Sequence, residues 1–236
     1  MFKKLQRPKT IRNDHQKQRG IDMSMVHRIK CGIANCYIVS DGVSGILIDT
    51  GTSLYLNTII DACKSYKIKL IILTHAHFDH IENAAALSEV FRVPIGMHKD
   101  DVDLIQSFAS QSMSAKAFLG KIILSATKIS SKRKMREFAP FVLLEDGDDL
   151  TGYGITAKII GLPGHTKGSI GIDIDKKAVI VGDALMNIFY PTVSLLYNDE
   201  KMMLNSAKKI TELGERTVYF GHGKPLKNRV WVKEDV

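Results

Sequence analysis

The sequence predicts an α/β domain in which short strands alternate with helices. Three observations lead to this prediction. The chain has 236 residues, which suits one sizeable domain. Its composition, 44% hydrophobic and 25% charged, is ordinary for a globular protein. Short apolar runs that end in turn residues are separated by segments of helical periodicity, a pattern typical of sheets layered with helices.

In the first half of the chain, strands and turns begin near His27. The Asp41–Gly42 pair separates two apolar runs, as a turn between neighbouring strands would. Leu56, Ile59 and Cys63 share one helical face. The predicted strands are residues 36–39, 45–48, 69–73 and 93–97, and the predicted helices are residues 54–66 and 81–91.

In the second half, apolar residues between Leu104 and Ile123, Ala115 among them, recur at helical spacing. They predict one or two helices followed by a basic loop. A further helix is expected over residues 199–213, with Asn198 as its N-terminal cap. The predicted strands are residues 155–160, 178–181 and 217–220.

The net charge of +8 is unevenly distributed. Residues 1–20 carry +6 and residues 104–136 carry +7, so the remainder of the chain carries −5. Residues 1–22 lack apolar periodicity and are interpreted as a basic N-terminal extension. Residues 23–236 are interpreted as a single domain with a basic helical insertion over about residues 100–136. Charge runs of this kind usually form solvated faces.

The composition also argues against several classes of protein. No apolar stretch is long enough to span a membrane, so no membrane partner is expected. The basic N-terminus has no apolar segment behind it, which argues against a secretory signal and favours the cytoplasm. Cys31, Cys36 and Cys63 show no zinc-like pairing and are expected to be free, mostly buried thiols.

The segment from Thr74 to His80 holds four metal-capable side chains directly after the apolar run Leu70–Leu73. Three imidazoles and a carboxylate are costly to bury together unless a cation organises them. The segment is therefore a candidate metal site, with the ligands His75, His77, Asp79 and His80.

Three more residues belong with this segment: His165, Asp183 and His222 each follow a predicted strand at a turn of small residues. Strand ends lie side by side in a sheet, so these side chains can converge. Five histidines and two aspartates exceed the four ligands of one tetrahedral ion and suit two ions. A shared carboxylate and a bridging water or hydroxide are then expected. Nitrogen and oxygen ligands fit zinc, iron or manganese and argue against an iron–sulfur cluster.

The remaining histidines stand outside this group. His15 and His27 are expected on the surface, and His98 is expected to be structural because it belongs to no motif.

Together these motifs resemble those of the metallo-β-lactamase superfamily, in the family's order. The segment His75–His80 matches its HxHxDH signature, and Asp49, the segment Pro163–Thr166, Gly182–Asp183 and Gly221–Gly223 are similar to its other motifs. The match runs from about residue 27 to residue 226. The resemblance implies a four-layer αββα sandwich, in which two mixed sheets lie face to face with helices outside.

The resemblance also implies the roles of the site residues. Asp49 would orient a ligand, although its place before Thr50–Gly51 fits a turn aspartate equally well. One ion would be held by His75, His77 and His165, the other by Asp79, His80 and His222, and Asp183 would bridge them.

The expected reaction is hydrolysis by a hydroxide that bridges two divalent ions, with zinc favoured over iron or manganese. Asp79 would orient the nucleophile and shuttle its proton. The expected substrate is an ester, a thioester, a lactone or a similar small molecule that could be anionic.

Two alternatives stay open. A phosphodiesterase or nuclease would use the same ions to hold a phosphate, and the basic residues 128–136 could overhang the site. Nucleic acid is nevertheless a disfavoured partner. A di-iron redox protein is weaker still, because the flavin-linked branch carries Glu at the position of His77 and a flavodoxin-like domain.

Several subfamilies fit poorly, so the chain resembles a generic member of the hydrolase branch. True β-lactamases generally lack an equivalent of Asp183 and are exported. Lactonases of acyl-homoserine lactones carry Tyr where this chain has Met186, and hydroxyacylglutathione hydrolases have a C-terminal extension. The sequence leaves the oligomeric state open. The stretch from Met186 to Met203 could line a pocket or a partner surface, with core packing favoured.

Overall fold

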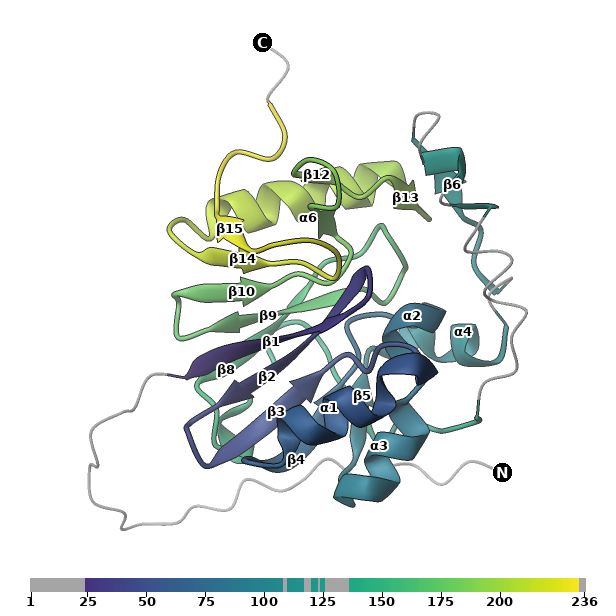
Figure 1. Cartoon of the computed structure of the whole chain (residues 1–236). Helices are drawn as coiled ribbons and strands as arrows, with labels where there is room; N and C mark the ends of the chain where they lie inside the picture. Colours follow the sequence, from purple (N-terminus) through teal and green to yellow (C-terminus); the bar gives the residue numbers. More distant parts are fainter. Residues whose placement is uncertain (1–23, 108–109, 117–119, 123, 126–135, 234–236) are drawn as a thin grey trace.

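The computed structural model describes residues 24–107, 110–116, 120–122, 124–125 and 136–233, which form two mixed sheets with helices on their outer faces (Figure 1). The first sheet has six strands, and β1 to β3 are antiparallel neighbours, whereas β3, β4, β5 and β7 run parallel. Its strands, in spatial order, are β1 (Met25–Cys31), β2 (Ala34–Ser40), β3 (Ser44–Ile48), β4 (Lys67–Ile72), β5 (Ile95–Met97) and β7 (Val142–Leu143).

The second sheet has five strands, and the β10–β14 pair is its parallel one. Two short ribbons pair β11 with β12 and β13 with β6. The second sheet comprises, in spatial order, β15 (Leu226–Lys227), β14 (Thr217–Tyr219), β10 (Ala178–Ile180), β9 (Ile170–Ile174) and β8 (Ala157–Gly161). The ribbon strands are β6 (Ser114–Ala115), β11 (Leu185–Met186), β12 (Thr192–Val193) and β13 (Leu196–Tyr197).

Three layers of apolar side chains confirm the predicted αββα arrangement. Because side chains alternate across a strand, Ile46 and Ile48 of β3 point between the sheets while Leu47 points outward. The middle layer joins Ile48 and its neighbours to Ile172 of β9. The outer layers pack one helix set on each sheet, with Ile59 of α1 on the first sheet and Ile210 of α6 on the second.

The helices are short, apart from α6, and their bounds are α1 (Leu56–Cys63), α2 (Phe78–Ile81), α3 (Ala84–Phe91), α4 (Val102–Gln106) and α6 (Glu200–Glu212). Single 3-10 turns occupy Ser53–Tyr55, Lys99–Asp101 and Thr151–Tyr153. The predicted cap of α6 was wrong by one residue: the Asp199 side chain accepts a hydrogen bond from the Met202 amide. The Asn198 amide side chain is used elsewhere, because it donates to the carbonyl oxygen of Ser112.

Two further local features differ from the sequence-based expectations. Helical periodicity was expected through Ala115, but this residue lies in β6, where its backbone pairs with Leu196 of β13. Cross-strand hydrogen bonds there override the helical spacing of the side chains. The strand β9 was not predicted at all, although Ile170, Ile172 and Ile174 alternate with small or polar residues as a half-buried strand requires.

Some predictions fall outside the described residues, namely those for residues 1–22, including His15, and for most of the basic run 128–136. The division into a tail, a domain and an insertion stays a prediction. His27 is exposed, and Nδ1 of His98 accepts the Asp100 amide, as surface and structural roles require. The three cysteines are free and buried. Among the described residues, no helix has the length and apolar character needed to cross a membrane.

Candidate metal centre

The predicted ligands come from the carboxyl ends of strands in both sheets. The first sheet supplies the segment 74–80, which follows β4. The second sheet supplies His165 after β8, Asp183 after β10 and His222 after β14. All seven predicted residues lie together where these strand ends meet, so the structure gathers side chains from two sheets rather than from one.

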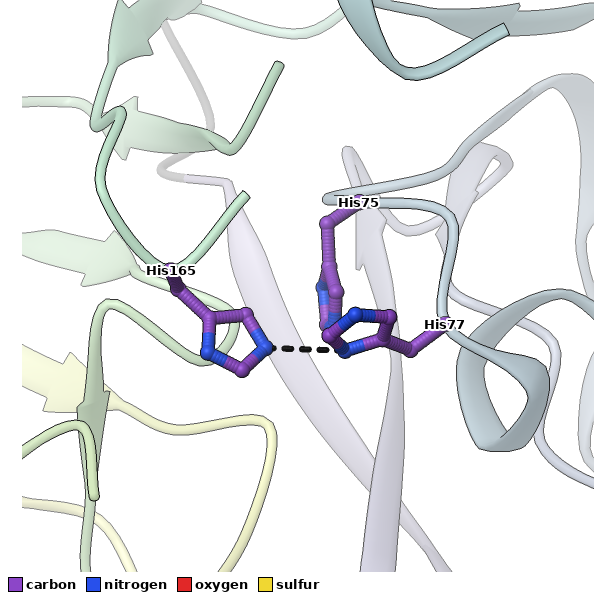
Figure 2. A group of neighbouring side chains, drawn as sticks. All are labelled: His75, His77 and His165. Atoms are coloured by element: carbon purple, nitrogen blue, oxygen red, sulfur yellow. Dashed lines mark hydrogen bonds between the residues drawn. The ribbon is translucent and has the colours of Figure 1, made fainter. Parts of the chain in front are cut away.

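His75, His77 and His165 form the first group of the cluster (Figure 2). Their ligand-capable atoms lie within 4.8 Å of one another. Nε2 of His165 is 2.9 Å from Nδ1 of His77, and the His75 ring packs edge-on against both other rings. This first group is made of imidazoles alone.

Asp79, His80 and His222 form the second group. Nε2 of His80 lies 3.3 Å from Nε2 of His222. Oδ2 of Asp79 is 3.3 Å from Nε2 of His222 and 3.8 Å from Nε2 of His80. The second group therefore combines two imidazoles with a carboxylate.

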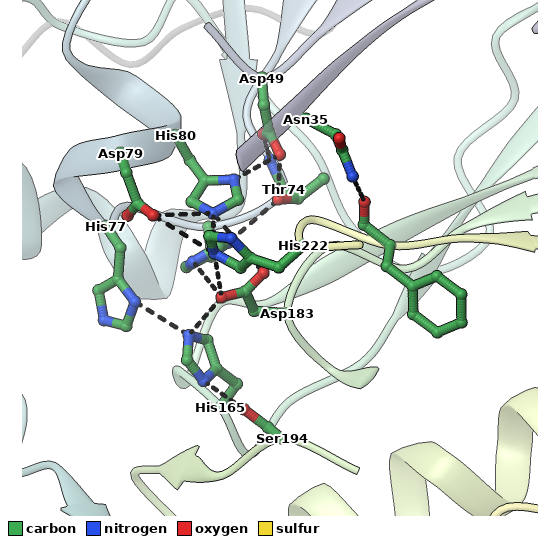
Figure 3. A network of polar contacts seen from close by, with 12 residues as sticks. Asn35, Asp49, Thr74, His77, Asp79, His80, His165, Asp183, Ser194 and His222 are labelled. Atoms are coloured by element: carbon green, nitrogen blue, oxygen red, sulfur yellow. Dashed lines mark hydrogen bonds and ion pairs between the residues drawn. The ribbon is translucent and has the colours of Figure 1, made fainter. Parts of the chain in front are cut away.

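Asp183 lies between the two groups (Figure 3). Its Oδ2 atom is 3.7 Å from Nε2 of His165 and 4.0 Å from Nε2 of His75, in the first group. The same oxygen is 3.2 Å from Nε2 of His222, and Oδ1 is 3.6 Å from Nε2 of His80, in the second. One carboxylate is thus within 4.0 Å of two histidines on each side.

The spacing and chemistry of these atoms fit divalent metal ions. Donors around one tetrahedral zinc ion lie about 3.3 Å apart, because each Zn–N bond is about 2.0 Å long. Two buried atoms of the cluster, Nε2 of His75 and Oδ1 of Asp183, have no hydrogen-bond partner among the described residues. Buried polar atoms are normally satisfied, and cations between the groups would satisfy both.

Hydrogen bonds outside the cluster fix which nitrogen of each ring carries the proton. Nδ1 of His165 lies 2.8 Å from the carbonyl oxygen of Leu196, and Nδ1 of His222 lies 3.0 Å from that of Ile33. Because a carbonyl can only accept, both Nδ1 atoms donate, and in the neutral rings both Nε2 lone pairs point into the cluster.

The same argument shows a conflict that a cation would remove. Nδ1 of His80 lies 2.8 Å from the carboxylate of Asp49 and donates to it. In the neutral rings, the Nε2 lone pairs of His80 and His222 therefore face each other across 3.3 Å. A proton or a metal ion between them turns this repulsion into attraction.

Asp49 supports ligands of both groups (Figure 3). It accepts hydrogen bonds from the amide and the hydroxyl of Thr74, at 2.7 and 2.8 Å, as well as from His80. The Thr74 hydroxyl oxygen lies 3.0 Å from Nδ1 of His75 and accepts a hydrogen bond from it, because the hydroxyl proton is donated to Asp49. Asp49 has φ of 58°, a conformation that is uncommon for a residue with a side chain and is held here by these bonds.

Charge divides the histidines into two kinds. Burial, together with the neighbouring histidines, lowers the pKa of His75 well below its ordinary value and that of His77 to about 3. Burial also lowers the pKa of His165. The first group is therefore neutral at physiological pH and offers lone pairs without first losing protons.

In the second group, the pKa values of the histidines are raised instead of lowered. Burial opposes the charged form of His80, but the carboxylates of Asp79, Asp183 and Asp49 together raise its pKa to about 9. The pKa of His222 is also raised well above its ordinary value, because Asp183 and Asp79 outweigh burial. His222 and His80 in turn hold the pKa of Asp183 below its usual range despite its burial.

A glycine allows the second group to close. A Cβ atom at Gly221 would overlap Oδ1 of Asp183 and would lie 2.9 Å from Cε1 of His80. Asn35 holds this turn, because its side-chain amide donates to the carbonyl oxygens of Phe220 and Gly223. Strand β2 of the first sheet thereby fixes the turn of the second sheet that carries His222.

The sequence interpretation missed several supporting residues, of which Asp101 is the most connected. This fully buried carboxylate accepts hydrogen bonds from the Ala76 amide and from the hydroxyl of Thr166. It also accepts from the Gly168 amide and the Gln111 side chain. Asp101 therefore ties the His75–His80 segment to the turn that carries His165. Nothing in its sequence context distinguishes it from an exposed aspartate.

Comparison with known proteins places this geometry in a family. The family model described as Metallo-beta-lactamase superfamily matches residues 29–222. A probable metallo-hydrolase of Methanocaldococcus jannaschii is 30% identical over 198 residues, which cover 81% of this chain and 88% of that protein. Hydroxyacylglutathione hydrolase 1 of Vibrio vulnificus is 28% identical over 198 residues, which cover 81% of this chain and 63% of that protein.

Among solved structures, BLEG-1 B3 metallo-beta-lactamase superposes with a TM-score of 0.66 at 26% identity. The superposition covers 86% of this chain and 94% of that one. The matched region contains Asp49 and all seven residues of the cluster. This chain belongs to the metallo-beta-lactamase superfamily.

Proposed function

We propose that this chain is a hydrolase that holds two divalent ions and uses water to cleave an ester, a thioester, a lactone or a similar small substrate. The position of Asp183 carries the proposal. Its carboxylate lies within 4.0 Å of histidines from both groups, where one residue can be shared between two cations.

His75, His77 and His165 would hold the first ion, Asp79, His80 and His222 the second, and Asp183 both. When bound, the ions supply Lewis acidity that lowers the pKa of a water and polarises a carbonyl oxygen. The nitrogen and oxygen donor set favours zinc, and iron or manganese would also fit it.

Asp79 would orient the attacking water. Its side chain is 32% exposed, against 7% for Asp183, and it borders the cavity above the cluster. In the metal-free protein, burial opposes ionisation of Asp79, but His80 and His222 hold its pKa below its usual range. Bound cations would replace the charge of these rings, so the carboxylate would stay ionised, accept a hydrogen bond from water, take up its proton on attack and pass that proton to the leaving group.

The names of the relatives support hydrolysis. One relative is named as a probable metallo-hydrolase and another as a hydrolase of hydroxyacylglutathione. The phosphodiesterase alternative depended on basic residues that lie mostly outside the described part of the chain. The described member of that run, Arg136, pairs with Glu89 and does not line the cavity. The cytoplasm remains the compartment that we expect from the sequence.

The test combines metal analysis with a substrate panel. We expect close to two zinc, iron or manganese ions per purified chain by elemental analysis. Removal by a chelator should abolish hydrolysis of p-nitrophenyl acetate, a thioester or a lactone, and metal addition should restore it. Full activity in the metal-free protein would contradict the proposal. Faster cleavage of bis-p-nitrophenyl phosphate than of the carbonyl substrates would instead favour the phosphodiesterase.

A further inference from the structure

A cavity of about 590 Å³ opens above the cluster, and its walls are mostly apolar. Its floor contains five of the predicted ligands. The large apolar side chains that line it are Ile33, Phe78, Ile122, Met186, Ile188, Phe189 and Leu196. A cavity of this volume is within the range that holds a small organic molecule.

The apolar walls belong to the same backbone segments that orient the ligands. The carbonyl of Ile33 accepts the Nδ1 proton of His222, and the carbonyl of Leu196 accepts that of His165. The amide of Asn187, between Met186 and Ile188 in sequence, donates to the carbonyl of His222 at 2.9 Å. The backbone that carries these side chains is thus fixed relative to the cluster.

Three of the wall residues are unusually exposed for their type. Ile33 is 73% exposed, Phe189 69% and Ile122 52%, and all three border the cavity. Large apolar side chains clustered at the mouth of a cavity are typical of binding surfaces. An apolar ligand would cover them and gain free energy in proportion to the area removed from water.

Within the described part of the chain, the charged side chains that line the cavity all belong to the cluster. Among the described residues that line it, Asp79 and Asp183 are the acids, and there is no lysine or arginine. Thr52 and Tyr55 add two hydroxyl groups. A charged group carried into these walls would lose water without gaining an ionic partner.

We infer that the substrate is a neutral ester or thioester of an apolar acyl group of medium length, whose chain lies between Ile33 and Phe189 while its carbonyl faces the cluster. This inference rests on the proposed function and narrows it, because the sequence had left an anionic substrate open. Water adds to the acyl carbon, the bond to the alcohol or thiol breaks, and the products are the carboxylic acid and the alcohol or thiol.

The first experiment measures kcat/KM of the metal-loaded protein for p-nitrophenyl esters from acetyl to octanoyl. We expect a rise of up to about fourfold for each added methylene until the cavity is filled. Butyryl and succinyl esters, which have four-carbon acyl groups but differ in charge, form a second pair. We expect the neutral ester to be preferred at least about tenfold.

The second experiment uses two phenylalanines of equal exposure. Phe189 and Phe141 are both 69% exposed, but Phe189 lines the cavity and Phe141 does not. Phe189→Ala should lower the ratio of octanoyl to acetyl kcat/KM about tenfold. Phe141→Ala should leave this ratio unchanged. An equal change in both variants would overturn the inference.

A third measurement does not depend on turnover. Straight-chain methyl ketones have no leaving group, and their dissociation constants can be measured from shifts of protein methyl signals in NMR spectra. We expect 2-nonanone to bind more tightly than 2-butanone, and Phe189→Ala to reduce the difference. Equal or undetectable binding of both ketones would overturn the inference.

These results separate the two proposals. Hydrolysis of all the esters with no dependence on chain length would overturn the apolar substrate and leave the hydrolase proposal standing. Absence of hydrolysis together with chain-dependent ketone binding would overturn the hydrolase proposal and leave only an apolar binding site beside the cluster. If light scattering shows a dimer that Phe189→Ala dissociates, and chain length has no effect, the apolar rim is an interface between copies and the inference fails.

Discussion

His75, His77 and His165 differ from His80 and His222 in the charge that surrounds them, although all five rings lie in one cluster. The first three rings contact other imidazoles, His75 packs against His80 as well, and burial lowers the pKa values of all three. The other two face Asp79 and Asp183, and their pKa values are raised.

This difference has a consequence for metal binding. The first group offers neutral nitrogen donors, whereas the second offers negative charge but must first release protons. The Asp183 carboxylate lies within 4.0 Å of histidines in both groups and connects them. The predictions below test how far the two groups can be separated, beginning with the change that affects both.

Asp183→Asn should have the largest effect, because it removes the charge that the two groups share. We expect hydrolysis to fall by more than about 100-fold, the upper end of the effect of losing a partner of a ligand. Metal content should fall while circular dichroism shows an intact fold. Asp146→Asn, which breaks a surface ion pair with Lys209, is the control. A variant with full metal content and rate would show that Asp183 does not bridge.

Asp49→Asn should weaken metal binding by about 10- to 100-fold, because Asn cannot accept from His80 as a carboxylate does. Competition with a chromogenic chelator measures the effect on each ion. We expect the second ion to be affected more, since Asp49 contacts His80 directly and reaches His75 only through Thr74. Equal weakening of both ions would show that the groups act as one.

Gly221→Ala should cost about 1–3 kcal/mol of metal-dependent stability, because its Cβ would displace Asp183 and His80. Thermal unfolding with and without metal measures this cost. Gly152→Ala is the matched control, since no other heavy atom lies within 4 Å of a Cβ at that position. An Ala variant that binds both ions normally would show that the close approach is not required.

The smallest expected effect is the release of protons when the metal-free protein binds an ion. The pKa of His80 is about 9, so this ring is charged at pH 7 in the metal-free protein and must lose its proton to bind an ion. Calorimetry in buffers of different ionisation enthalpy should show release of at least one proton at pH 7. Release should decline, and affinity should level off, as the pH rises through about 9. Binding without proton release would contradict the difference between the groups.

The local sequence was sufficient for parts of the fold and the site. The segment His75–His80 was evident because its polar residues directly follow a buried strand. The strand predictions near residues 45–48, 69–73 and 217–220 were confirmed because their apolar runs are uninterrupted. The metal-ligand roles of the seven residues stay a prediction until an ion is measured.

Other features depended on contacts between distant segments. Ala115 pairs with Leu196, so its helical spacing was misleading. Asp101 resembles any surface aspartate in sequence, yet it is buried between two ligand turns. The stretch from Met186 to Met203 was expected mainly in the core, with a pocket lining as the alternative, and Met186 and Phe189 line the cavity. Its apolar residues alone could not show which of them border the cavity.

By itself, the sequence determined which side chains are capable of binding metal and which strands precede them. Both the polar side chains and the apolar strands form short, contiguous patterns in the sequence. The packing of the two sheets decided that His75 and His222 meet around Asp183, which charges surround each ring, and how apolar the cavity is. These properties depend on distances of a few ångströms between residues far apart in the chain, and the middle apolar layer between the sheets fixes those distances.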